Sequence, residues 1–554
     1  MWLINTESLK LESIVDHEKV EYAILSHTWA EDEVLWSDFN DLPRARLKKG
    51  FEKIEKTCEL ARGRGLRYAW VDTCCIDKTS SAELSEAINS MFRWYQDAAV
   101  CFVYLSDLGG DSADSLQGVL DHLPKCRWLT RGWTLQELIA PRNLYYFYDN
   151  EWKNSWPKED LAPKISEITR IPLDILLHQK SLDTVSIASR MSWAATRETT
   201  RAEDMSYSLL GIFDINMPML YGEGKKAFFR LQEEICRRSK DLTLFAWQTS
   251  PGTSTSKYHG LFAEHPRDFA GAHDLQISDA RMPYTSELRL TNKGICLRET
   301  ELALVRSTGH FLSLGCSRAG SPHDTFIHLT KTMDGFVRTH AGELVASLPD
   351  SAWWLSPRDV YLPASLTSDD VRRIEHQDNH MIKFTVGSKV TIAKQMPYNF
   401  WDPLNKAFLL SSDVGSTSGG AGIYQGLLEL SMSWKGQFHK RHLIFELRAD
   451  PSKPGTLPGR PRMVLKHKVV DGFHRPLQYW LDRDGFRQPK MSVHLRQEIS
   501  RELLSNTFTK EGEGLSSWAI TSQKLSEPPP KLYVEVRNTT VDTGQTWEFE
   551  LACR

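Results

Sequence analysis

The sequence predicts an N-terminal α/β domain with a parallel, flavodoxin-like sheet, then a helical extension, then a β-rich, sandwich-like C-terminal region. Three observations lead to this fold class. Strand-like apolar runs alternate with helical patterns over residues 1–150, helical periodicity follows up to residue 240, and short β-type runs between Gly, Pro and Ser clusters come after it. Because 554 residues are too many for one core, several domains are expected.

Four apolar runs in the first 150 residues are predicted to be strands of one sheet. They span residues 21–28, 66–72, 99–105 and 143–148. Their nearly continuous apolar character is typical of strands that helices cover on both faces. Because short links and helices separate them, the strands are expected to run parallel.

Helices are predicted between these strands. The first covers about residues 44–62, with one apolar stripe made by Leu47, Phe51, Ile54, Cys58 and Ala61. The second begins at a capping box, Ser80–Glu83. A third, which contains Trp133, follows the third strand.

No catalytic residues are predicted in the segments after residue 150. Residues 151–240 form the helical extension, in which Thr200–Glu203 matches a capping box. Gly222–Lys225 lacks the spacing of a phosphate loop, so we do not interpret it as one. Residues 241–370, beginning with the β-type run Leu242–Trp247, form a β-rich domain, and residues 371–554 form a second one or continue the first.

Composition and charge narrow the class of protein. The 68 basic and 71 acidic residues leave a net charge of −3, which does not indicate a nucleic-acid or anionic-membrane partner. No apolar run approaches the roughly 18 residues of a membrane span, and the N-terminus lacks the pattern of a signal peptide. Nine cysteines without a pattern are typical of a reducing compartment, so a cytoplasmic location is expected.

Metal and thiol chemistry are weighed and not favoured. On a helix His376 and His380 could share a metal, but no third ligand can be named, so a polar loop is the preferred interpretation and no metal site is predicted. The adjacent thiols of Cys74 and Cys75 have no local base, so a structural role is preferred for them.

Polar residues follow three of the predicted strands at their carboxyl ends. They are Ser26-His27-Thr28, Asp72-Thr73 and Ser106-Asp107. In parallel sheets ligands bind beyond this edge, so the three groups are candidates for one site. The alternative is that strand ends are polar because the chain turns there.

Four motifs carry a resemblance to a known family. They are residues 22–29 (YAILSHTW), 70–78 (WVDTCCIDK), 83–92 (ELSEAINSMF) and 131–138 (RGWTLQEL). Together they resemble the HET (heterokaryon, or vegetative, incompatibility) domain of filamentous fungi. Residues 192–197 (SWAATR) and 221–224 (YGEG) are similar to the segment that usually follows it. One departure is Ala30, where the family has Gly.

The resemblance implies a role in non-self recognition that triggers programmed cell death when incompatible cells fuse. It also implies action upon self-association, with a homo-oligomer and an unidentified protein partner or incompatibility factor. The β-rich region is the natural candidate for the sensor of that partner, and for an inhibitor of the N-terminal domain.

A second resemblance, to Toll/interleukin-1 receptor (TIR) domains, implies a reaction. Catalytic TIR domains cleave NAD at the nicotinamide ribosyl bond with a Glu in a Trp-x-x-x-Glu helix, which corresponds to Glu137 after Trp133. NAD would be the substrate, and no cofactor is expected. The residues expected around the substrate are Ser26, His27, Trp29, Asp72, Thr73, Asp77 and Trp133.

The chemistry at Glu137 has a structural alternative. A carboxylate can stabilise the oxocarbenium-like state of glycosidic cleavage, and a neighbouring indole can raise its pKa by excluding water. However, the motif recurs at Trp29 and Glu33, so chance produces it. Glu137 could equally be a buried carboxylate paired with Arg131 or Arg127, in a non-catalytic module that acts by self-association. His27 is likewise either a general base or a histidine satisfied by backbone.

Overall fold

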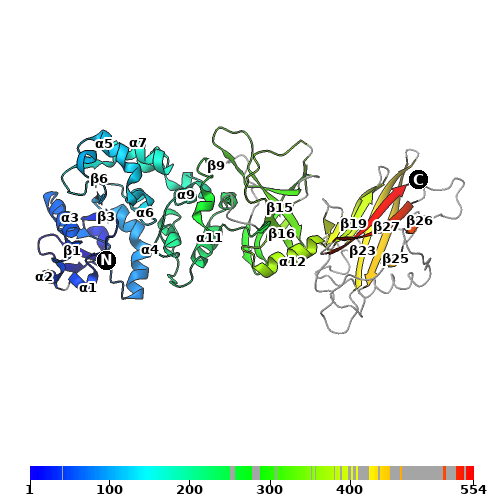
Figure 1. Cartoon of the computed structure of the whole chain (residues 1–554), viewed down its shortest axis with the longest axis horizontal. Helices are drawn as coiled ribbons and strands as arrows, with labels where there is room; N and C mark the ends of the chain where they lie inside the picture. The colour runs from blue at the N-terminus through cyan, green and yellow to red at the C-terminus, as the bar shows by residue number, and fades with distance from the viewer. Residues whose placement is uncertain are drawn as a thin grey trace.

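The computed structural model describes the first half of the chain almost completely and mainly the strands of the rest. The described residues are 1–39, 41–249, 256–277, 287–305, 309–332, 334–350, 352–355, 357–379, 381–386, 390–396, 401–402, 407–409, 423–434, 437–448, 462–464, 516–519, 532–541 and 544–553. Figure 1 shows the N-terminal sheet, the helical segment, and the later β sheets following one another along the long axis.

The N-terminal region is built on a sheet whose strand order is β2–β1–β4–β3–β5–β6–β7. Its centre is parallel and contains the four predicted strands: β3 (Tyr22–His27), β4 (Tyr68–Trp70), β5 (Val100–Tyr104) and β6 (Leu144–Tyr148). The edges are antiparallel and were not predicted: β1 (Trp2–Asn5), β2 (Leu11–Ser13) and β7 (Ser155–Pro157). The sheet is therefore mixed and not parallel throughout.

Helices α3 (Phe51–Gly63) and α4 (Ser81–Asp97) connect the central strands. Since β4 and β5 flank β3 on opposite sides, right-handed crossovers put α3 and α4 on opposite faces of the sheet (Figure 1). The first predicted helix begins about two turns too early, at 44 instead of Phe51, because residues 42–45 form a separate short helix, α2 (Leu42–Ala45), and Leu47 is 85% exposed in the turn that follows it.

The predicted cap of α4 is half formed. Ser80 Oγ accepts a hydrogen bond from the Glu83 amide at 3.3 Å, as in a capping box. The Glu83 carboxylate accepts from the amide of Asp77 at 3.1 Å, so it closes the loop after β4 against the start of the helix.

The remaining described helices have between 4 and 13 residues. They are α1 (Trp36–Phe39), α5 (Leu116–His122), α6 (Thr134–Ile139), α7 (Lys158–Thr169), α8 (Leu173–Leu176), α9 (Ile187–Ser192), α10 (Asp204–Tyr207), α11 (Lys226–Arg238) and α12 (Ser368–Asn379).

The capping box predicted at Thr200–Glu203 is wrong. Helix α10 begins later, with Glu203 at its N-cap, and the Glu203 side chain turns away from the helix. Its Oε1 accepts from the amides of Gly222 at 2.8 Å and Gly224 at 2.9 Å. Both glycines have positive φ, which aims successive amides at one oxygen. The Gly222–Lys225 loop thus binds a carboxylate of its own chain.

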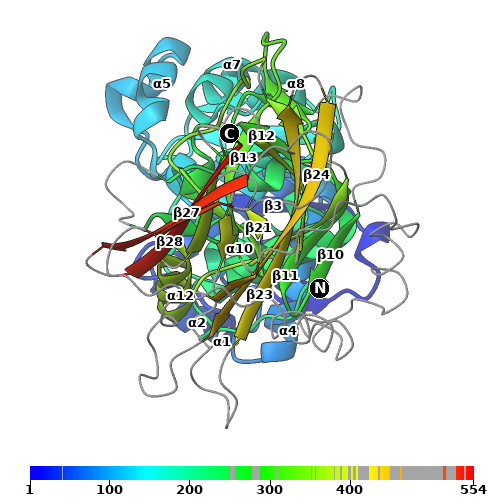
Figure 2. The ribbon, with the colours of Figure 1, turned by 90° about the vertical axis from the view of Figure 1, so that its right-hand side faces the viewer.

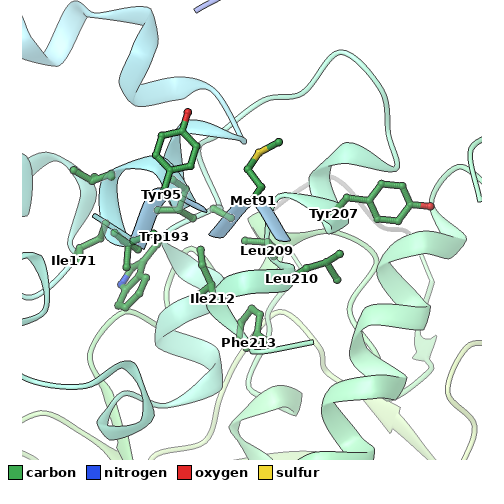
Figure 3. Packing of buried hydrophobic residues seen from close by; sticks show 14 of the residues in the cluster. Met91, Tyr95, Ile171, Trp193, Tyr207, Leu209, Leu210, Ile212 and Phe213 are labelled. Carbon is green, nitrogen blue, oxygen red and sulfur yellow. The ribbon is translucent and has the colours of Figure 1, made fainter. Parts of the chain in front are cut away.

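The extension and the α/β region share one hydrophobic core. Figure 3 shows Met91 and Tyr95 of α4 near Trp193, Leu209 and Ile212 of the extension, and all five are buried. The same cluster continues into the first β sheets, as far as Leu362. Helix α4 therefore packs against the extension.

The β-rich region begins after a short helical turn. The run at 242–247, predicted as a strand, forms a 3₁₀ helix over Leu242–Phe245 instead. Asp241 explains the difference, because its carboxylate accepts from the amides of Thr243 at 2.9 Å and Ile187 at 2.8 Å and so caps two helices at once.

The described strands between residues 258 and 362 form three sheets. Their orders are β17–β12–β13–β15–β16–β8, β10–β11–β18 and β14–β9. The strands are β8 (Tyr258–His259), β9 (Leu275–Ile277), β10 (Leu288–Thr291), β11 (Gly294–Thr300), β12 (Ala303–Val305), β13 (Gly309–Ser313), β14 (Cys316–Arg318), β15 (Phe326–Thr332), β16 (Gly335–Thr339), β17 (Trp353–Trp354) and β18 (Arg358–Leu362).

The described strands after residue 380 form two further sheets, β21–β22–β19–β28–β27–β26 and β20–β23–β24–β25. The strands are β19 (Met381–Val386), β20 (Val390–Met396), β21 (Trp401–Asp402), β22 (Ala407–Leu409), β23 (Ile423–Trp434), β24 (Gln437–Arg448), β25 (Arg462–Val464), β26 (Ser516–Ala519), β27 (Leu532–Val541) and β28 (Gly544–Cys553). Figure 2 shows the long antiparallel pairs β23–β24 and β27–β28 in front. Strand β28 pairs in parallel with β19, so the two ends of this segment lie in one sheet, and a sandwich packing stays a prediction.

Gly132, just before α6, provides a test of how closely the extension packs on the α/β region. Its amide donates to the carbonyl of Glu198 at 2.9 Å, and a Cβ at this position would overlap the Thr199 methyl group. We expect Gly132→Ala to lower the free energy of unfolding by about 1–3 kcal/mol in denaturant titration. Gly63→Ala, at a helix end with no atom within 4 Å of the new methyl, should change it by less than about 1 kcal/mol. Equal effects of the two substitutions would contradict the close packing.

Candidate functional site

The candidate site lies where the strand order reverses. The chain passes from β3 to β4 on one side and then to β5 on the other, so the carboxyl ends of β3 and β5 form a topological switch point. Ligands of open α/β sheets bind at such points. Ser26 and His27 are the last residues of β3, and α6 brings Glu137 to the same edge.

Ser26, Trp128 and Glu137, here called the Glu137 cluster, are joined by hydrogen bonds. Ser26 Oγ donates to Glu137 Oε2 at 2.5 Å and accepts from the Trp128 indole Nε1 at 2.8 Å. Ser26 is fully buried and Glu137 is 6% exposed. One hydroxyl therefore uses both its donor and an acceptor lone pair to hold an indole and a carboxyl group.

Burial raises the pKa of Glu137 from 4.5 to about 8, against the lowering effect of the Ser26 hydrogen bond. The negative charge of Asp72 raises the pKa further, while a hydrogen bond from Tyr95 and the positive charge of Arg197 lower it. The Glu137 carboxyl group is consequently protonated at neutral pH in this closed arrangement.

His27, Trp29, Asp72 and Lys78, here called the Asp72 cluster, lie closer to the surface. Asp72 Oδ1 is 2.9 Å from His27 Nε2, and Oδ2 accepts from Trp29 Nε1 at 2.8 Å. The Asp72 side chain remains 21% exposed. Burial raises the pKa of Asp72, but the hydrogen bond and charge of His27, the charge of Lys78 and the Trp29 hydrogen bond outweigh it and lower the pKa to about 2.

Trp29 is the exposed wall of the Asp72 cluster. Trp29 is 43% exposed, and the Lys78 ammonium group lies 3.6 Å from the centre of its ring. Lys78 Nζ is buried and has no hydrogen-bond acceptor among the described residues. A ligand base that stacked on this face of Trp29 would have to displace Lys78.

His27 is held by side chains on both ring nitrogens. Lys53 Nζ is 2.8 Å from His27 Nδ1, and an ammonium group can only donate, so Nδ1 accepts and the proton sits on Nε2, which donates to Asp72. Lys53 also pairs with Glu33. To act as a general base, His27 would have to give up the Lys53 contact. The hydrogen-bond partners of its ring are side chains and not backbone groups.

Glu33 shows what a structural carboxylate looks like in the second Trp-x-x-x-Glu motif. Its Oε1 pairs with Lys53 and accepts from the amide of Ala30 at 2.7 Å. Ala30, the departure from the family pattern, is thus held by its amide in a loop that closes on Glu33.

The other predicted site residues lie around these clusters. Thr73 is buried, and its Oγ1 has no hydrogen-bond partner among the described residues. Asp77 accepts from the amide and hydroxyl of Thr79 at 2.9 and 2.6 Å, so it shapes the loop after β4. Trp133 hydrogen-bonds Asp204 of the extension and packs against the core.

Several residues of the site were not predicted. The indole beside Ser26 belongs to Trp128, one turn before Trp133, and Lys53, Lys78 and Arg197 supply the positive charges. Trp128, Lys78 and Arg197 all lie within or beside the motifs that carry the family resemblance, and this position in the sequence could have indicated them as site residues.

The structure also bears on a metal site, a reactive thiol and a membrane-spanning helix. Within the described part of the chain no group of three or more His, Cys, Asp or Glu side chains is arranged to hold a metal ion, and His380 lies outside it. Burial raises the pKa of the Cys74 thiol well above its usual value, so the thiol is not a nucleophile at neutral pH. None of the described helices has the length and apolar character to cross a membrane.

Comparisons with known proteins bear on the same region. Residues 22–120 match the model of the family "Heterokaryon incompatibility protein (HET)", and residues 226–296 match a domain of unknown function (DUF8212). The vegetative incompatibility protein HET-E-1 of Podospora anserina is 50% identical over 219 residues, which are 39% of this chain and 16% of that protein. No solved structure matches. The resemblance to HET domains is confirmed, although Glu137 lies beyond the matched residues.

The raised pKa of Glu137 predicts a pH-dependent stability. A carboxyl group whose pKa is higher in the folded state favours folding most at low pH, and this contribution is lost as pH rises from about 4.5 to about 8. Glu137→Gln, which mimics the protonated group, should match the wild type near pH 4.5 and become the more stable protein towards pH 8 and above, as measured by denaturant titration.

The exposed Glu151 provides a matched control for this titration. Glu151→Gln should leave the pH dependence of the unfolding free energy as it is in the wild type. A wild-type curve parallel to that of Glu137→Gln between pH 4.5 and 8 would mean that Glu137 is not a buried acid.

Proposed function

Since residues 22–120 are a HET domain, we propose that the chain acts in heterokaryon incompatibility as an effector that triggers cell death after non-self recognition. The similarity to the vegetative incompatibility protein HET-E-1 supports this role. That match covers 39% of this chain and only 16% of the relative, and we propose the β-rich region of this chain as the sensor.

The proposed reaction is hydrolysis of NAD at the nicotinamide ribosyl bond. One observation carries it: two carboxyl groups at the switch point have pKa values pushed apart, to about 8 for Glu137 and about 2 for Asp72. Pairs of this kind divide the roles of acid, base and charge stabilisation in hydrolases. The strand order β4–β3–β5–β6, which is that of flavodoxin- and TIR-like sheets, supports the same site.

The two carboxyl groups have different roles in this mechanism. The C–N bond breaks with its electron pair leaving on nicotinamide, which departs neutral because the ring of NAD is cationic. Asp72, ionised and partly exposed, stabilises the positive charge that develops on the ribose. Glu137 takes the proton of the attacking water, for which a pKa near the working pH is suitable.

Because Glu137 is buried, we also propose that the protein must self-associate before it can act on NAD. Because Glu137 is 6% exposed beneath Ser26 and Trp128, substrate requires a movement of α6 or of the segment that carries Trp128. We therefore expect NAD hydrolysis from self-associated protein. The same burial favours the second candidate function, a non-catalytic module that kills by self-association, in which Glu137 only stabilises the fold.

NAD consumption by the full chain, clustered through a terminal tag on a multivalent support, separates the two functions. Glu137→Gln should lower kcat/KM by about 100-fold or more, and Glu151→Gln should leave it unchanged. In the wild type kcat/KM should rise with pH and level off above about 8, since Glu137 must be deprotonated to act as a base.

Folding and killing have to be checked in the same experiment. Unfolding midpoints of both variants confirm that the proteins compared are folded. The enzymatic proposal fails, and the scaffold function stands, if the wild type kills cells that express it while the clustered protein consumes no NAD. It also fails if clustered wild type and Glu137→Gln consume NAD equally.

A further inference from the structure

Arg197 comes from the helical extension and is buried beside the Glu137 cluster. It follows α9, lies 77 residues beyond the end of the HET match, and is 3% exposed. Its Nη1 donates to the carbonyl of Arg131 at 2.8 Å and to Thr134 Oγ1 at 3.0 Å, and its Nε donates to the carbonyl of Trp193 at 3.2 Å. The guanidinium group is therefore fixed in place on the first turn of α6.

A chain of hydrogen bonds leads from Arg197 to Glu137. Thr134 Oγ1, which accepts from Arg197, is also hydrogen-bonded to the carbonyl of Trp128. The indole of Trp128 in turn donates to Ser26, and Ser26 donates to Glu137. Arg197 thus holds the segment that carries both the indole and the carboxyl group of the site.

The charge of Arg197 is not balanced by an ion pair. Its Nη2 is buried without a hydrogen-bond acceptor, and no carboxylate within the described residues forms a salt bridge with it. A buried cation without a partner is costly, and ionisable groups in such perturbed surroundings are candidates for functional roles. Glu137 is the carboxyl group whose charge acts most on Arg197.

We infer that Arg197 is a positioning residue of the site, and that its free guanidinium edge is the counter-charge for the Glu137 carboxylate once that group loses its proton. The extension then supplies a counter-charge for Glu137 from outside the residues that match the HET family. The inference rests on the proposed function only in taking Glu137 as the reacting carboxyl group.

Other ionisable groups also face Glu137 and are part of its titration. They are Asp72 after β4, Tyr95 of α4, Cys101 of β5 and Tyr145 of β6, and Lys158 of α7 lies behind Cys101. Tyr95 and Tyr145 have pKa values raised well above the usual range by burial, so both are neutral when Glu137 titrates. Arg197 is the cation whose charge lowers the pKa of Glu137.

Infrared difference spectroscopy of the full chain against pH tests the inference without NAD. The band of the protonated Glu137 carboxyl group is assigned by its absence in Glu137→Gln. Arg197→Gln keeps a donor but removes the charge, and should raise the midpoint of this band by about one pH unit or more. Arg197→Lys keeps the charge and should hold the midpoint within roughly half a unit of the wild type.

A matched control separates the charge from the clamp. Arg197→Lys serves here as well, because it keeps the charge but cannot reproduce all the hydrogen bonds to Arg131, Thr134 and Trp193, so it should lower the thermal midpoint while the Glu137 titration stays in place. An unchanged Glu137 midpoint in folded Arg197→Gln would overturn the inference and leave Arg197 as a structural clamp.

A measurement on the wild type keeps the test independent of how the variants fold. With isotope-labelled arginine, a guanidinium band that is missing in Arg197→Lys should shift at the same pH at which the Glu137 band disappears. Guanidinium bands that stay constant through that pH would also overturn the inference. Absence of NAD hydrolysis would not affect either result, so failure of the proposed function and failure of this inference are distinguishable.

Discussion

The position of Glu137 depends on one buried hydroxyl group. Ser26 ends the central strand β3 and connects it to α6 by donating to Glu137 while it accepts from Trp128. In a dry environment an unpaired indole N–H or carboxyl group is costly, so this hydroxyl makes the burial of both acceptable. The closed position of Glu137 beside Trp128 follows from satisfying these groups together.

The contrast between the two carboxyl groups has a simple physical origin. Asp72 receives hydrogen bonds from His27 and Trp29 and lies near the charge of Lys78, so its ionised form is favoured. Glu137 receives its main hydrogen bond from a neutral hydroxyl in a site that excludes water, so its protonated form is favoured. The negative charge of Asp72 also disfavours a second negative charge on Glu137. The two states are therefore coupled through the edge of the sheet.

The fold was predictable where burial is expressed locally. Strands β3, β4, β5 and β6 are apolar almost throughout because helices cover both faces, whereas β1 and β2 are short, half-polar edge strands with no such pattern. Ser26 and Asp72 lie where the sequence predicted them, at or just after the ends of β3 and β4, and their part in a site stays a proposal. Trp128 and Arg197 could not be assigned, because their roles come from contacts 102 and 63 residues away along the chain. The helical turn at 242–245 was missed because a cap from Asp241 outweighs the β-type composition.

The extension belongs physically to the site. Arg197 binds the first turn of α6, Trp133 meets Asp204, and Trp193 and Leu209 share a core with α4, so α6 has no complete environment without residues 151–240. Glu203, which occupies the amides of the Gly222–Lys225 loop, anchors this extension at its far end. Removal of the extension would expose the apolar face of α4 and take away the Arg197 hydrogen bonds to the carbonyl of Arg131 and to Thr134. The environment of α6 and of Glu137 therefore depends on residues beyond 120, where the match to the HET family ends.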